Sequence, residues 1–110
     1  MGQARKRGVD IWEAIRGMIA PVLERWRKRY PGSRRRVLLE RLMAAANAED
    51  PAELMTAGEE FLALTGEVPP GFYVESRTLP PRYLLSGQRV VGRRRSEDWA
   101  IHPYHPQVWR

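Results

Sequence analysis

Apolar residues recur every three to four positions over residues 11–30, which is the spacing of one face of an α-helix. The members of this stripe are Ile11, Trp12, Ile15, Met18, Ile19, Val22, Trp26 and Tyr30. Asp10 precedes the stripe and Glu13 follows it at the spacing of a capping box. The pattern predicts a first helix over about 11–30, ended by Pro31-Gly32. Because Pro21 removes one backbone hydrogen bond inside it, we expect a kink or two short helices sharing one direction.

Two further amphipathic segments follow. Ser33 is a good N-cap for a second helix over about 34–47, whose apolar positions include Leu38, Leu39 and Leu42. Asp50, Pro51 and Glu53 combine a cap, a first-turn proline and an acid at the third position. They predict a third helix over about 51–65, closed by Gly66. Gly58 weakens this third prediction because it interrupts the apolar stripe without a side chain to bury.

After Gly66 the helical periodicity gives way to short apolar segments separated by prolines. Residues 68–74 and 79–85 both read apolar, Pro-Pro, one spacer, aromatic, then apolar. The prolines favour polyproline II and the aromatic-aliphatic triplets favour strands. A short hairpin between 83–85 and 89–91 is one interpretation of this region, and a short helix from Pro80 to Gly87 is the alternative.

Together these elements predict a mostly α fold, a small three-helix domain with an extended C-terminal arm rich in proline and aromatic residues. The predicted segments are a basic flexible arm over 1–9, the three-helix domain over 10–66 and the extended arm over 67–110. The arm holds six of the ten aromatic residues. Because buried aromatic rings contribute large apolar areas, we expect the arm to pack on the helices or on a neighbouring chain. Trp99 and Trp109 are the predicted anchors.

The net charge of +6 is unevenly distributed. Residues 1–48 contain twelve Lys or Arg and four acids, residues 49–75 seven acids and no base, and residues 76–110 seven Arg and two acids. Seventeen of the nineteen basic residues are Arg, which forms bidentate contacts with phosphate and carboxylate. This pattern indicates an anionic partner for the basic blocks, or folding of the acidic block onto them.

The densest basic cluster flanks the turn at Pro31-Gly32. Cations at the end of the first helix suit the helix dipole, whereas three arginines in the first turn of the second helix oppose it. A phosphate docked at that turn would explain them, and the alternative is solvation or intrachain pairing with the acids of residues 49–60. The predicted nucleic-acid-binding residues are Arg25, Arg27, Lys28, Arg29, Arg34, Arg35 and Arg36, with Arg93, Arg94 and Arg95 as a second tract.

Other functional classes have little support in the sequence. There is no cysteine and no glycine-rich phosphate loop, so we expect a protein that is not an enzyme and needs no cofactor. His102 and His105 have only Glu97 and Asp98 as nearby ligands, so we expect no metal site. The longest apolar run has six residues, against about 20 for a spanning helix, and no secretory signal follows the basic start. We therefore expect a cytoplasmic protein with no membrane partner.

Two functional hypotheses remain. The leading one is a small basic nucleic-acid-binding protein, with DNA or RNA as its partner. The alternative is a non-enzymatic assembly or adaptor subunit, as in a phage or ribonucleoprotein particle, with a protein partner or further copies of itself. It would dock through the acidic third helix and the arm, at Glu53, Glu59, Glu60, Trp99 and Trp109. A surface-active helix over 11–30 is a third class, weakened by Pro21 and by the acids within it.

Overall fold

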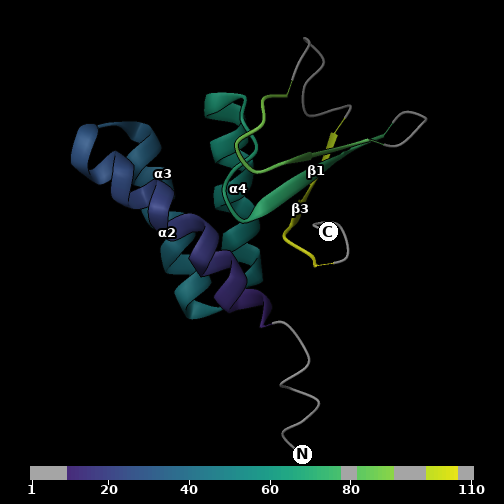
Figure 1. Cartoon of the computed structure of the whole chain (residues 1–110), viewed down its shortest axis with the longest axis horizontal. Helices are drawn as coiled ribbons and strands as arrows, with labels where there is room; N and C mark the ends of the chain where they lie inside the picture. Colours follow the sequence, from purple (N-terminus) through teal and green to yellow (C-terminus); the bar gives the residue numbers. More distant parts are fainter. Residues whose placement is uncertain (1–9, 78–81, 91–98, 107–110) are drawn as a thin grey trace, which may run out of the picture.

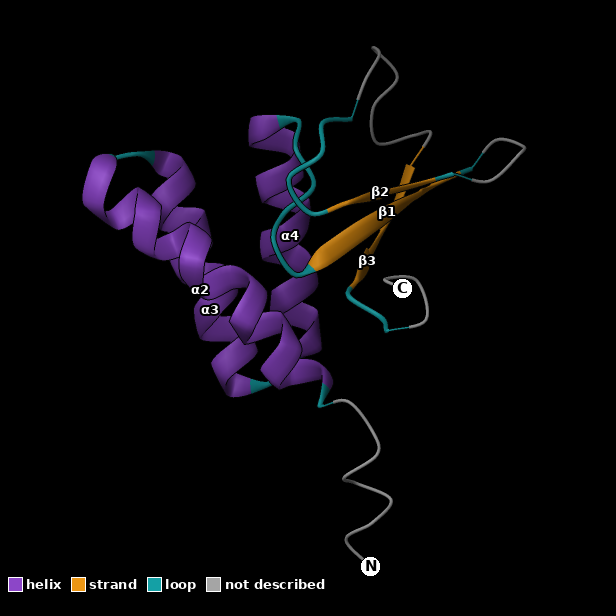
Figure 2. Ribbon diagram, in the orientation of Figure 1, coloured by secondary structure: helices purple, strands orange, loops and turns teal. Residues whose placement is uncertain are grey.

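The computed structural model describes residues 10–77, 82–90 and 99–106, with three helices followed by three short strands (Figure 1). The elements are α2 (Ile11–Arg29), α3 (Arg34–Ala48), α4 (Pro51–Thr65), β1 (Phe72–Ser76), β2 (Tyr83–Leu85) and β3 (Trp99–Pro103). The helices lie together on one side of the sheet (Figure 2). The predicted mostly α class is confirmed, and no helix of the described residues is long and apolar enough to cross a membrane.

Each helix begins at the capping residue that the sequence indicates. The side chains of Asp10, Ser33 and Asp50 each accept a hydrogen bond from the backbone N–H three residues further on. Gly66 ends α4 with φ at 74°, a left-handed conformation that glycine adopts without steric cost. The predicted helix bounds therefore agree with the observed bounds to within one residue.

α2 continues through Pro21 as one helix of 19 residues, and not as two short ones. Pro21 and Gly17, four residues earlier, are both exposed. The hydrogen bond that Pro21 removes is thus on the solvent side of α2, where water can satisfy the free carbonyl. This placement explains why the helix tolerates the proline.

The strands form an antiparallel sheet in the order β2-β1-β3. Tyr73 of β1 lies opposite Leu85 on one side and opposite His102 on the other. The two Pro-Pro segments of the sequence therefore end in neighbouring, paired strands. The strand predictions for both aromatic-aliphatic triplets are confirmed.

The partner predicted for residues 83–85 is wrong, and so is the alternative of a helix over this segment. These residues pair with β1, while residues 87–90 lie beside residues 66–68 through backbone hydrogen bonds of 2.9 Å. The pairing observed brings Leu84 against the core, which a hairpin with 89–91 does not require. Burial of apolar surface thus selects the register over local turn preference.

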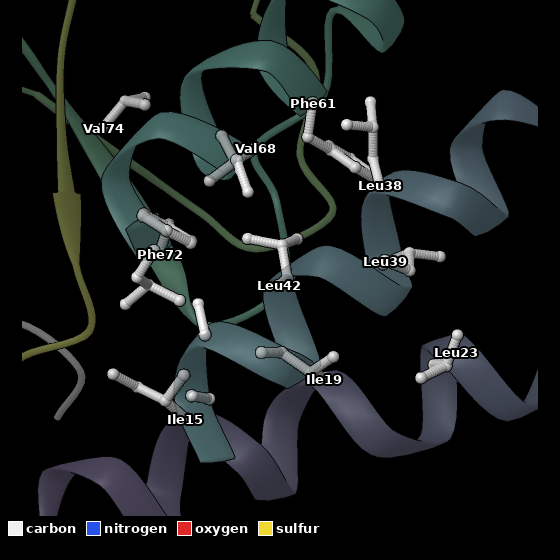
Figure 3. Close-up of a cluster of buried hydrophobic side chains, with 14 residues drawn as sticks. Ile15, Ile19, Leu23, Leu38, Leu39, Leu42, Phe61, Val68, Phe72 and Val74 are labelled. Carbon is white, nitrogen blue, oxygen red and sulfur yellow. The ribbon is translucent and has the colours of Figure 1, made fainter. Parts of the chain in front are cut away.

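One cluster of buried apolar side chains joins the helices to the C-terminal region (Figure 3). Its members are Ile15, Ile19, Leu23, Leu38, Leu39, Leu42, Ala45, Ala46, Leu54, Ala57, Phe61, Val68, Phe72 and Val74. The three members that follow Gly66 are no more than 1% exposed. The described part of the predicted arm therefore supplies core residues, and Trp99 packs against the same cluster as a partly buried side chain.

Gly58 of α4 faces the ring of Phe72 on β1. A Cβ atom at position 58 would lie 2.5 Å from Cζ of Phe72, too close for any real side chain. Phe72 therefore occupies the space that a side chain at Gly58 would fill. The gap that Gly58 leaves in the apolar stripe of α4 is a packing requirement of the sheet.

Candidate nucleic-acid interface

The basic residues that flank the first interhelical turn lie together where α2 ends and α3 begins, which we call the α2–α3 corner (Figure 1). The turn itself is fixed by local hydrogen bonds. The backbone N–H of Ser33 donates to the carbonyl of Tyr30 at 3.1 Å, and Nε of Arg36 donates to the carbonyl of Pro31 at 2.6 Å. The corner consists of Arg25, Arg27, Lys28, Arg29, Tyr30, Arg34, Arg35 and Arg36.

Two of these cations face one acid on α3. Arg27 binds Glu40 through two hydrogen bonds of 2.8 and 2.7 Å, and Nη1 of Arg36 lies 3.6 Å from the same carboxylate. The hydrogen bond from Arg27 is the main cause that lowers the pKa of Glu40 below its usual value, and it also raises the pKa of Arg27. The charges of Arg27 and Arg36 are thus partly neutralised within the chain.

Arg35 is directed inward and acts as a packing residue. Its Nη1 donates to Glu67 at 3.1 Å, and its guanidinium lies 4.6 Å from the ring centre of Trp26 and 5.7 Å from that of Phe61. A recess of about 170 Å³ borders it, lined in part by Arg25 and these same rings. Arg35 therefore connects α2, α3 and α4 to the segment after Gly66.

The other four cations of the corner are exposed and form no ion pair with any described residue. They are Arg25, Lys28, Arg29 and Arg34, and we call them the unpaired cations. Tyr30 is 54% exposed beside them, with its ring 4.9 Å from that of Trp26. The structure therefore divides the seven basic residues of the corner into three engaged ones and four available ones.

The acidic residues of α4 do not reach the corner. Glu53 and Glu60 both bind Arg41 of α3, at 3.0 and 2.7 Å, and these hydrogen bonds raise the pKa of Arg41. Glu59 is exposed and forms no ion pair within the described ranges. The acids that pair with cations of the corner are Glu40 and Glu67, which the sequence did not single out.

The remaining predicted site residues are distributed differently. Trp99 lies at the start of β3 against the core, whereas Arg93, Arg94, Arg95 and Trp109 lie outside the described residues, as does the predicted arm over 1–9. In the part of the chain that the structure describes, no three His, Cys, Asp or Glu side chains gather as a metal site. His102 instead lies in β3 with its Nε2 3.4 Å from a carboxylate oxygen of Glu75.

Sequence reasoning missed the side of the sheet that faces away from the helices. Tyr73 and Tyr83 lie there with ring centres 5.9 Å apart, and the imidazole of His102 is 5.1 Å from Tyr73. The alternation of residues in the strand triplets is the signal that separates these rings from the buried Phe72 and Val74. That signal is usable only once the strand partners are known.

Comparison with known proteins finds no matching family model, no matching curated protein and no matching solved structure.

Proposed function

We propose that this is a small basic nucleic-acid-binding protein, not an enzyme, that contacts phosphates through the unpaired cations of the α2–α3 corner. The observation that carries the proposal is the group of four exposed cations without an ion pair among the described residues. Charges of one sign gathered on one edge attract a polyanion and release its counterions. The cytoplasm is the location we propose, where both DNA and RNA are available.

The geometry of the corner supports phosphate as the ligand. The first turn of α3 has backbone N–H groups without intrahelical partners, and Arg34 lies in that turn. An anion placed there is favoured by the helix dipole and by guanidinium hydrogen bonds together. The exposed ring of Tyr30 adds a surface on which a base or sugar can pack.

The alternative of an assembly or adaptor subunit receives less support from the contacts. Glu53 and Glu60, two of the three acids expected to meet a partner, already bind Arg41 within the chain. Trp99 is partly buried against the core and therefore has limited surface to offer. Only Glu59, of the described residues in that predicted set, is exposed without an ion pair to the described chain.

The proposal is tested with two double variants that each remove two positive charges from the same corner. Arg29→Gln with Arg34→Gln removes unpaired cations, and Arg27→Gln with Arg36→Gln removes the two that face Glu40. Binding to a fluorescein-labelled duplex DNA is measured by anisotropy at several salt concentrations. We expect the first pair to reduce the slope of log affinity against log salt by about 0.9 for each lost phosphate contact, and the second pair to reduce it less.

Both double variants lose two positive charges, so a difference between their salt slopes reports phosphate contacts and not overall charge attraction. Circular dichroism shows whether each variant is folded. Equal slopes for the wild type and the Arg29/Arg34 variant, with the fold intact, would reject the corner as the phosphate site.

A further inference from the structure

The register of the sheet separates its side chains into two faces. Phe72 and Val74 of β1 are fully buried, and Val74 lies opposite Leu84 on β2 and opposite Ile101 on β3. These residues form the face that packs on the helices. Tyr73, Tyr83 and His102 adjoin these residues along their strands. They therefore project from the opposite face, because successive side chains of a strand alternate.

That opposite face, which we call the outer face, carries a row of three rings across the strands. Tyr83 of β2, Tyr73 of β1 and His102 of β3 follow one another with ring-centre distances of 5.9 and 5.1 Å. Tyr83 is 49% exposed and the side chain of His102 is 40% exposed. All three helices lie on the other side of the sheet, so no helix of the described chain covers these rings (Figure 2).

The backbone holds the rings in place before any ligand arrives. Tyr73 and His102 are cross-strand partners, and Tyr83 lies diagonally from Tyr73. Burial, with smaller contributions from Glu75 and Tyr83, raises the pKa of Tyr73 above its usual value of 10.0. Its phenol is thus neutral at physiological pH and offers no negative charge to a polyanion.

One unpaired cation lies beside the outer face. Arg77 follows β1 in the alternation of Tyr73 and Glu75, and it is exposed and forms no ion pair with a described residue. Arg82 is next to Tyr83 and therefore alternates to the face of Leu84. Glu75 is the one acid among the residues of the three strands, and its carboxylate faces Nε2 of His102 at 3.4 Å. Arg77 therefore offers a free cation to an anionic ligand, while the single acid is held beside His102.

We infer that the outer face of the sheet binds single-stranded nucleic acid by stacking bases on Tyr83 and Tyr73, with Arg77 near the phosphates. The inference rests on the proposed function that the protein binds nucleic acid, and it adds the class of strand. Bases of a duplex are stacked within the helix and cannot reach such rings, whereas unpaired bases stack on aromatic side chains with little sequence preference. This face is distinct from the α2–α3 corner, which lies at the other end of the molecule in Figure 1.

The test uses the full chain, a fluorescein-labelled oligo(dT) of about 12 nucleotides and a labelled duplex of the same length. Tyr83→Thr removes the most exposed of the three rings of the outer face but keeps a residue that favours strands. Tyr83→Phe is the matched control, because it keeps the ring and removes only the hydroxyl. We expect Tyr83→Thr to weaken oligo(dT) binding by about fivefold or more and to leave duplex binding within about twofold. Tyr83→Phe should bind both probes as the wild type does.

A second variant guards against loss of the strand. His102→Phe preserves a ring beside Tyr73, and circular dichroism with a mass measurement establishes the fold and the oligomeric state of every variant. Unchanged oligo(dT) affinity in a folded Tyr83→Thr variant overturns the inference. The inference is also overturned if the wild type has a mass above that of the monomer and Tyr83→Thr returns it to the monomer mass. The outer face would then be a contact between two copies.

The Arg29/Arg34 double variant separates this inference from the proposed function. If Tyr83→Thr weakens oligo(dT) binding while the double variant changes neither probe, the outer face is supported and the corner is rejected. If only the double variant has an effect, the corner stands and the outer face is rejected. A wild type that binds neither probe rejects both.

Discussion

The α2–α3 corner and the outer face of the sheet present opposite mixtures of charge and aromatic surface. The corner has four unpaired cations around one exposed ring, whereas the outer face has three rings with one unpaired arginine, Arg77, beside them. A surface with much charge and one ring suits the phosphates of any nucleic acid, and a surface with several rings and little charge suits unpaired bases. The comparison shows how one small chain can offer both kinds of contact on separate elements.

The corner also shows which arginines remain available. Arg35 lies next to the partly buried ring of Trp26 and the buried ring of Phe61, and a charge partly removed from water needs a partner, which Glu67 provides. Arg29 and Arg34 lie at the exposed ends of their helices, where water solvates the guanidinium. Position relative to the core, and not the density of the arginine run, therefore decides which cations stay unpaired.

The largest effect is expected from Gly58→Ala, which should weaken the packing of the sheet on α4 and leave the corner unchanged. The added methyl would meet the ring of Phe72, and overpacking of this kind costs about 1–3 kcal/mol even though alanine favours helix. Gly17→Ala is the matched control because a Cβ there meets no atom within 4 Å, and it should stabilise α2 by up to about 1 kcal/mol.

Urea unfolding followed by circular dichroism measures both effects. Oligo(dT) binding should fall with Gly58→Ala at partly denaturing temperatures, before duplex binding does, because the sheet loses its contact with α4 while the corner lies elsewhere. A Gly58→Ala variant as stable as Gly17→Ala would show that Phe72 does not need this space.

The second prediction contrasts two neighbouring arginines. Arg35→Gln removes a charged hydrogen bond and two ring contacts, so we expect a loss of about 1–2 kcal/mol in unfolding free energy. Arg34→Gln changes an exposed residue and should alter stability by no more than about 0.5 kcal/mol. For duplex affinity we expect the larger loss in Arg34→Gln, because of these two arginines only Arg34 is available to phosphate. Equal losses of stability in the two variants would contradict the inward placement of Arg35.

Local signals predicted the helices well, because a capping side chain and its backbone partner lie three residues apart. Asp10, Ser33 and Asp50 fix the starts of the helices through such bonds, so nothing remote is needed to place them. The sheet required remote information. The partner of Tyr83–Leu85 lies in β1 and not in the adjacent segment, and only the burial of Leu84 selects it.

The same distinction applies to the candidate sites. The sequence located the basic corner but not its division, because Arg35 is separated from Glu67 by 32 positions. It also gave no reason to separate Tyr73 from Phe72, which point to opposite faces of β1 once the strand is paired. Residue type and spacing thus find where charge accumulates, and tertiary contacts decide which charges and rings are available.

The third prediction concerns the acids of α4. Glu53→Gln with Glu60→Gln removes both partners of Arg41, so we expect the melting temperature to fall by about 2–5 °C. Duplex affinity should change no more than in a control variant that neutralises Glu59 and one other exposed acid. The reason is that the carboxylates of Glu53 and Glu60 do not touch the corner. A selective gain in duplex binding on losing Glu53 and Glu60 would instead mean that the acidic helix screens the basic surface.

The smallest change, Glu40→Gln, converts engaged cations of the corner into available ones. The hydrogen bond from Arg27 lowers the pKa of Glu40 below its usual value of 4.5. A carboxylate with a lower pKa when folded stabilises the protein above its unfolded pKa, and that contribution is lost as the pH falls through the folded value. At pH 7 the variant should therefore melt about 1–4 °C below the wild type, and the difference should narrow as the pH falls below 4.5.

The same substitution should tighten duplex binding at pH 7, because Arg27 and Arg36 lose the acid they share and join the unpaired cations. The slope of log affinity against log salt should steepen by up to about 0.9 for each arginine that gains a phosphate. Glu59→Gln is the matched control, since it removes an equal charge from an exposed acid that pairs with no described residue. If both variants steepen the slope equally, the effect is one of net charge alone, and the pairing with Glu40 does not limit what the corner can bind.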